Sequence, residues 1–106
     1  LQATPEFVDV LVAHDLLVWR DGWPTRDLHH WRLSSGQEVD FILEENRQLL
    51  PVEVKAADAV GEAEARHLTT FRDRHADALR GVLLSCDPRI RMVKPGIVAC
   101  PWWAVV

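Results

Sequence analysis

Apolar and polar residues alternate along two neighbouring stretches, residues 38–43 and 49–55. An apolar side chain at every second position is typical of a β-strand with one face turned to the core. Asp40 lies on the polar face of the first stretch, and Glu53 and Lys55 share the polar face of the second. The remaining alternate positions are predicted to face the core: Val39, Phe41, Leu43, Leu50, Val52 and Val54. The pattern therefore predicts two strands whose outer face carries two carboxylates and one ammonium group.

Apolar residues recur every three to four positions in two further segments, and this spacing predicts two helices. The first helix is predicted to start at Thr4-Pro5-Glu6, with Thr4 as the capping residue, and to run to about Trp19. The second is predicted over residues 62–78. Its expected buried stripe consists of Ala65, Leu68, Phe71 and His75.

Short apolar runs bounded by turn residues complete the pattern. They predict additional strands at residues 28–33, 82–85, 90–93 and 97–99. The order of elements is αβββαβ with a β-rich tail, which indicates an α/β fold with a central mixed sheet flanked by helices. The 106 residues suffice for one domain, 1–106, and the start at Leu1 suggests a fragment of a longer protein.

Charge is distributed unevenly along the chain. The formal net charge is −4, but residues 1–53 hold four basic and ten acidic groups, whereas residues 54–106 hold eight and six. The overall balance argues against nucleic-acid binding through bulk charge. If the domain has a phosphate-contacting surface, it should come from the second half, where basic groups outnumber acidic ones. Solvated charges remain the simpler explanation. The candidate side chains there are Arg66, Arg72, Arg74, Arg80, Arg89 and Arg91.

Two carboxylates and a lysine on one face suit metal-dependent chemistry. Asp40 and Glu53 offer the oxygen ligands that Mg²⁺ or Mn²⁺ prefers, and Lys55 could orient a water beside the ion. Only two of the twelve basic residues are lysines, which makes Lys55 stand out. The simpler alternative is a polar hairpin face on which Lys55 forms a cross-strand ion pair.

The histidines add little to this picture. His29 and His30 follow each other on one predicted strand and point to opposite faces, so they cannot chelate one metal together. The two cysteines form no pattern typical of a disulfide framework, which favours a cytoplasmic location, and no apolar run is long enough to cross a membrane.

Three segments together resemble a known family: Trp31-Arg32, Gly36-Gln37-Glu38-Val39-Asp40-Phe41 and Leu49-Leu50-Pro51-Val52-Glu53-Val54-Lys55. They are similar to the core of the PD-(D/E)xK nuclease superfamily. They are still closer to a domain of unknown function at the C-terminus of prokaryotic AAA-type ATPases. His67-Leu68 with Phe71, and Gly81-Val82-Leu83-Leu84, look like the helix and strand that follow in that family.

The resemblance implies a restriction-endonuclease-like fold with Asp40, Glu53 and Lys55 as catalytic residues. It also implies that a third acid on the first helix completes the metal site. Asp9 stands at the matching position, with Glu6 as the fallback. Three further side chains are expected to contact phosphate or to lie around the metal: His67, Arg66 and Gln37.

Two functions remain open from the sequence. The first is a metal-dependent nuclease or nucleic-acid-binding domain, with Mg²⁺ or Mn²⁺ as cofactor and DNA as partner. The second is a non-catalytic interaction or regulatory domain of the ATPase. The chain contains no P-loop motif, so the resemblance places the ATPase module N-terminal to Leu1. Association into a homo-oligomer is compatible with both functions.

Overall fold

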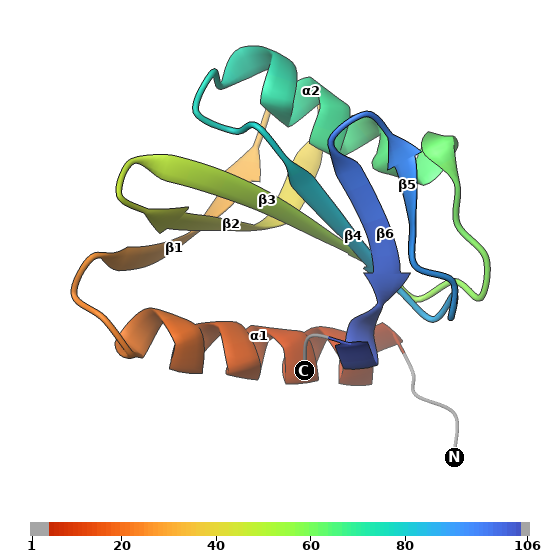
Figure 1. Ribbon diagram of the computed structural model, residues 1–106, viewed down its shortest axis with the longest axis horizontal. Coiled ribbons are helices and arrows are strands. Elements are labelled where there is room, and N and C mark those ends of the chain that lie inside the picture. The colour runs from red at the N-terminus through yellow and green to blue at the C-terminus, as the bar shows by residue number, and fades with distance from the viewer. Residues whose placement is uncertain (1–4, 105–106) are drawn as a thin grey trace.

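The computed structural model describes residues 5–104, with side-chain surroundings from Val8 onward. A six-stranded sheet lies between two helices, α1 (Pro5–Asp21) and α2 (Arg66–Arg74) (Figure 1). The strands are β1 (Arg26–Arg32), β2 (Glu38–Glu45), β3 (Gln48–Lys55), β4 (Gly81–Ser85), β5 (Arg91–Lys94) and β6 (Ile97–Pro101). Two short 3-10 helices are η1 (Glu62–Ala65) and η2 (Trp102–Ala104). This arrangement confirms the predicted α/β class, whereas the predicted cap Thr4 lies outside the described residues.

The strand order across the sheet is β1-β2-β3-β4-β6-β5. β1, β2 and β3 form an antiparallel meander, β3, β4 and β6 run parallel, and β5 returns antiparallel to β6. A parallel pair needs a crossover connection, and η1 with α2 provides it between β3 and β4. The predicted β2–β3 turn is tight because Asn46 and Arg47 both have positive φ, 54° and 66°, as a type I′ hairpin turn requires.

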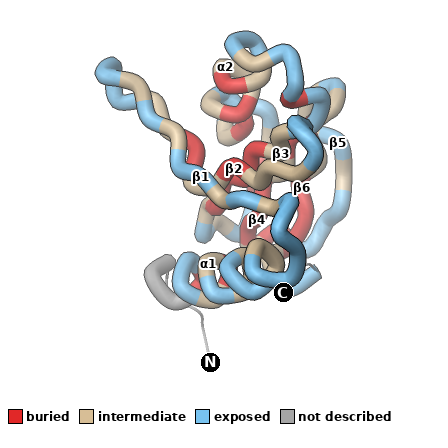
Figure 2. The backbone as a smooth tube through the Cα atoms, turned by 90° about the vertical axis from the view of Figure 1, so that its left-hand side faces the viewer, coloured by how far each residue is buried: buried red, intermediate tan, exposed pale blue. Residues whose placement is uncertain are grey.

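The sheet has a separate apolar core on each face. The α2 side is built around Leu68, Phe71 and Leu83, and the α1 side around Val8, Val12 and Leu84. Buried positions gather on the central strands and on the inward side of α2 (Figure 2). Both faces of β3, a central strand, are therefore covered. No helix within residues 5–104 combines the length and apolar character needed to cross a membrane.

A β-bulge interrupts β2 at the residues that matter most for the site. In β1, His29 pairs with Ile42 but Trp31 pairs with Val39, so two residues of β2, Asp40 and Phe41, stand opposite one residue of β1. As a result Val39 packs in the α2-side core, whereas Phe41 and Leu43 pack on the α1 side. The prediction that these three side chains share one face is wrong. An alternating pattern assumes regular pairing, and it gives no sign of the extra residue at a bulge.

The second predicted helix is also shorter than expected. Residues 62–65 form η1, and α2 ends at Arg74 rather than near residue 78. His75 is extended (φ −131°, ψ 102°), and its Nδ1 lies 2.9 Å from the Phe71 carbonyl oxygen. The Arg72 side chain donates to the carbonyl oxygens of three residues beyond the helix, Ala78, Leu79 and Pro95. These hydrogen bonds hold the chain after α2 in a non-helical path, which apolar spacing alone did not predict.

Candidate functional site

Glu53 is the buried carboxylate at the centre of the site. It occupies β3 between β2 and β4, and only 3% of its surface is exposed. Its Oε2 atom is buried and has no hydrogen-bond partner among the described residues. His67, in the first turn of α2, approaches Oε2 to 3.6 Å through Nδ1, which is within ion-pair distance but too long for a hydrogen bond. An unsatisfied buried carboxylate oxygen is costly, so this atom demands an explanation.

The surroundings of Glu53 disfavour its charge. Burial is the largest cause, and a side-chain hydrogen bond with the Asp40 carboxyl and the charge of that carboxyl add to it, so that together they raise the pKa of Glu53 to about 8. The ammonium group of Lys55 acts in the opposite direction and lowers this pKa. Without a cation, these surroundings therefore favour the protonated form of Glu53 at neutral pH.

Asp40 is held beside Glu53 by the backbone of β3. The pairing of β2 with β3 runs from the hairpin turn to Phe41 and Val52 and ends there, so β2 separates from β3 at the bulge. The Val54 N–H, which lies beyond the last β2–β3 pair, donates instead to Asp40 Oδ2 at 2.8 Å. At the bulge, the Asp40 side chain therefore accepts a hydrogen bond from β3, and this bond fixes the position of its carboxylate.

The alternative of a solvated polar hairpin face does not match this geometry. Glu53 is buried because α2 covers its face of β3. The alternation of residues in β3 alone predicts that this face is exposed to water. Among the described side chains, those of residues 8–104, no carboxylate lies within ion-pair distance of Lys55. The predicted cross-strand ion pair of Lys55 is therefore wrong.

Three of the predicted positively charged or polar residues gather beside the acids. Lys55, Arg66 and His67 line a pocket of about 270 Å³, together with Ala63 and Glu64. Arg66 is exposed and His67 half-buried, so both can reach a ligand in this pocket. Gln37 is not among its lining residues. It lies in the turn between β1 and β2, where its carbonyl oxygen accepts a hydrogen bond from the Leu33 N–H.

Asp9 lies on the other side of Asp40. The two acids line a shallow groove of about 330 Å³ with Val10, Ala13 and Phe41. Within the described residues, however, Asp9, Asp40 and Glu53 do not bring ligand oxygens all within 4.8 Å of one another. The fallback residue Glu6 has a side chain outside the described region. A third carboxylate is thus close to Asp40 but is not assembled with the other two.

Several arginines expected to contact phosphate instead stabilise the fold. Arg72 holds the loop after α2, while Arg89 and Arg91 bind the buried carboxylate of Asp87. Arg66, Arg74 and Arg80 remain exposed. The sequence could not separate these groups, since all are arginines in one basic half of the chain.

The residues present suit a divalent cation of the Mg²⁺ or Mn²⁺ type. Such ions prefer oxygen ligands and keep several waters, and a carboxylate oxygen without a hydrogen bond beside a second carboxylate matches that preference. A bound cation would also stabilise the ionised form of Glu53 that burial disfavours. Lys55 and Arg66 would provide positive charge next to the ion, and the His67 ring could form a hydrogen bond there.

The comparisons with known proteins agree with this fold. A search of curated proteins returned no match. A chain in the solved tetradecameric assembly of Thermococcus gammatolerans McrB AAA+ hexamers with bound McrC shares the fold, with a TM-score of 0.62 and 15% identity. The match covers 92% of the present chain but only 28% of that chain. Residues 6–105 match a family described as a domain of unknown function, DUF4143. The chain therefore belongs to the DUF4143 family.

Proposed function

We propose that this domain binds Mg²⁺ or Mn²⁺ between Asp40 and Glu53 and hydrolyses phosphodiester bonds in nucleic acid. The observation that carries the proposal is the buried Oε2 of Glu53, which has no hydrogen-bond partner in the described part of the chain and lies next to a second carboxylate. A structural carboxylate at such a position would be expected to have donors. A cation ligand accounts for the missing donor.

Each side chain of the site has a role in this proposal. Asp40 and Glu53 hold the cation, which would supply an acidified water and neutralise charge on the phosphate. Lys55 shares the α2-side face with Glu53, and its ammonium group orients the attacking water and, as a positive charge, favours the loss of a proton from it. Arg66 and His67 line the pocket beside Lys55 and bind the phosphate oxygens. Asp9 would lie beside the cation without forming a ligand group with the other two acids.

We further propose that the domain works next to an AAA-type ATPase in the cytoplasm, with DNA as the substrate. The matching chain of known structure comes from an assembly of AAA+ hexamers and is much longer than the part that resembles the present domain. This likeness supports a domain that is one part of a larger machine. The sequence resemblance to the C-terminal domain of prokaryotic AAA-type ATPases supports the same setting.

Calorimetric titration with Mn²⁺ at pH 8 tests the metal site. The comparison is between the wild type and Asp40→Asn, whose amide oxygen can still accept the Val54 N–H and so preserves the fold. Binding by the wild type alone, together with Mn²⁺-dependent cleavage of labelled DNA or RNA that is lost in Glu53→Ala, is the expected result. Absence of binding by a correctly folded wild type would overturn the proposal.

One observation favours a second function, a non-catalytic interaction domain. Val10, Leu17 and Val18 are exposed on α1, and their spacing of seven and eight residues places them on one side of the helix. An apolar helix face suits contact with another protein module, such as the ATPase. A folded domain that binds no Mn²⁺ but loses ATPase association in Val18→Glu would favour this function.

A further inference from the structure

A second group of potential ligands lies at the outer edge of the sheet, away from Glu53. β1 is an edge strand, and its Asp27 pairs directly with Glu44 of β2. His29 follows two positions along β1 and therefore points to the same face as Asp27. The sequence hid this group because it depends on the pairing register between two strands.

The three side chains converge on a small volume. The Nε2 atom of His29 lies 2.7 Å from Oε1 of Glu44 and 3.7 Å from Oδ2 of Asp27. One ligand atom from each residue lies within 4.8 Å of the other two. Ligand atoms about 2.0–2.2 Å from one zinc ion lie roughly 3–4 Å apart, so only small side-chain movements separate this group from a coordination geometry.

Charge distinguishes this group from the neighbouring cross-strand pair. One register position away, Arg26 forms an ion pair with Glu45 at 2.9 Å, so opposite charges face each other there. Asp27 and Glu44 instead place two acids opposite each other, with the His29 ring as their shared neighbour, so that a positive charge at this point is favourable. The Leu28 N–H donates to Asp27 Oδ1 at 2.8 Å, which fixes this carboxylate while Oδ2 faces His29.

We propose that Asp27, His29 and Glu44 bind a divalent transition-metal ion, with Zn²⁺ as the best match. One imidazole nitrogen and two carboxylate oxygens form a donor set that zinc accepts and Mg²⁺ disfavours. Three protein ligands leave a coordination position for water or for a ligand group. The ion would also link the edge strand β1 to β2. This site is independent of the proposed nuclease chemistry at Asp40 and Glu53.

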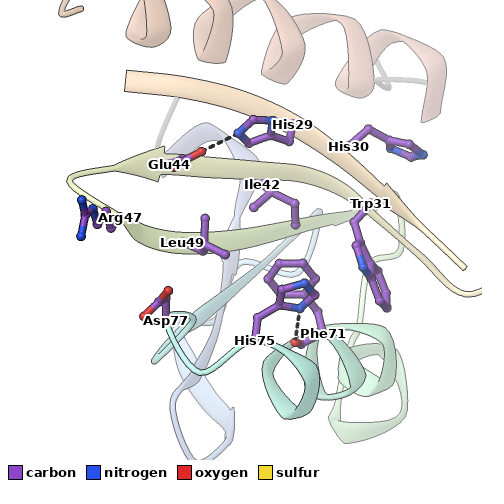
Figure 3. A pocket seen from close by; sticks show the side chains of 10 residues that line it. All are labelled: His29, His30, Trp31, Ile42, Glu44, Arg47, Leu49, Phe71, His75 and Asp77. Atoms are coloured by element: carbon purple, nitrogen blue, oxygen red, sulfur yellow. Dashed lines mark hydrogen bonds and ion pairs between the residues drawn. The ribbon is translucent and has the colours of Figure 1, made fainter. Parts of the chain in front are cut away.

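A groove lies next to the proposed zinc site and its open coordination position. His29 and Glu44 line a groove of about 450 Å³ between the β1–β3 sheet and the end of α2 (Figure 3). Trp31 and His75 contribute aromatic surface to the same groove, with their ring centroids 6.1 Å apart. A ligand with a carboxylate or phosphate could therefore contact the ion while its apolar part packs in the groove.

Titration of Zn²⁺ into Glu53→Gln by calorimetry tests the proposal, because this background weakens binding at the other site. One zinc site is expected, unaffected by millimolar Mg²⁺. Adding His29→Gln should weaken binding by more than about tenfold, as expected for loss of a ligand. His30→Gln is the matched control, since His30 is the next residue of β1, is also exposed and lies 3.9 Å from Glu38. Circular dichroism would confirm that each variant folds.

Cobalt provides a readout at the level of the ligands. A visible absorption band of bound Co²⁺ should persist in His30→Gln and be lost in both His29→Gln and Glu44→Gln. Three results would each overturn the proposal: no zinc binding in Glu53→Gln, equal affinities in His29→Gln and its parent, or equal losses in His29→Gln and His30→Gln. If zinc binds the wild type but not Glu53→Gln, the ion belongs to the Asp40–Glu53 site instead.

Discussion

Glu53 and Asp87 are two buried carboxylates with opposite surroundings. They lie on or just after neighbouring parallel strands, β3 and β4, and their exposed fractions are 3% and 1%. Asp87 accepts hydrogen bonds from the Val60 and Arg89 backbone N–H groups and from the side chains of Arg89 and Arg91. Glu53 leaves Oε2 without a hydrogen-bond donor among the described residues. Equal burial thus accompanies complete hydrogen bonding in one case and incomplete hydrogen bonding in the other.

The two environments shift the pKa values in opposite directions. The Arg89 guanidinium, assisted by backbone N–H groups and Arg91, holds the pKa of Asp87 well below its usual range. Burial and the Asp40 carboxyl raise that of Glu53 to about 8. Asp87 therefore links the loop after β4 to the loop before η1 as a permanent anion. Glu53 becomes charged readily only when a cation binds beside it. The opposite pKa shifts thus distinguish Asp87, a structural acid, from Glu53, a candidate functional one.

Removing the charge of Asp87 is expected to cause the largest loss of stability. Asp87→Asn would weaken the hydrogen bonds from Arg89 and Arg91 and leave a poorly satisfied group in a buried position. Thermal unfolding should show a melting temperature lower by several degrees or more. Asp58→Asn, an exposed acid in the preceding loop, is the matched control and should melt like the wild type. Similar melting of the two variants would contradict the structural role of Asp87.

Removing the charge of Glu53 should have the opposite effect above neutral pH. Between its ordinary pKa of 4.5 and about 8, the folded chain keeps a proton that the unfolded chain has released. The free energy of unfolding therefore falls as pH rises through this window, by at most roughly 1 kcal/mol or slightly more per pH unit. Glu53→Gln should abolish this fall and be more stable than the wild type at pH 8 in the absence of metal.

Urea unfolding at pH 5 and pH 8 measures this difference directly. The gain in Glu53→Gln should be a few kcal/mol at pH 8 and small at pH 5. If the variant were less stable than the wild type at pH 8, Glu53 would be a structural acid like Asp87.

Lys55 offers a test of chemistry without a change in metal binding. Lys55→Met should reduce the cleavage rate by about 100-fold or more, the usual range for loss of a group that assists proton transfer, while Mn²⁺ affinity changes little. The chain has one other lysine, Lys94, which pairs with Glu62 at 3.5 Å and is the natural control. Equal rates in Lys55→Met and Lys94→Met would exclude a role for Lys55 in the reaction.

The smallest expected effect concerns Arg66. Arg66→Ala should weaken DNA binding and reduce the slope of log affinity against log salt by about 1, as expected for one phosphate contact. Arg74→Ala removes an exposed arginine from the other end of α2 and should leave the slope unchanged. Fluorescence anisotropy with a labelled duplex at several salt concentrations would measure both. Identical slopes for the two variants would place the DNA elsewhere.

Much of the fold followed from residue patterns. Each predicted strand is present, and the spacing of Glu53 and Lys55 correctly placed them on one face of β3. Alternation could not predict the bulge at Asp40, because the inserted residue is defined only by pairing with β1. It also could not predict the burial of Glu53, since a strand pattern does not show which of its faces the predicted second helix covers. The group around His29 likewise depends on strand register, a tertiary property.

The hydrogen bond between the Val54 N–H and Asp40 Oδ2 gives the domain a built-in reporter. Most amide protons in a central strand are protected from exchange by the neighbouring backbone, but this one depends on a single carboxylate. The exchange rate of the Val54 amide therefore measures how often Asp40 turns away from β3. Comparing that rate with and without Mn²⁺ would show whether the ion locks the carboxylate in place or draws it off the strand.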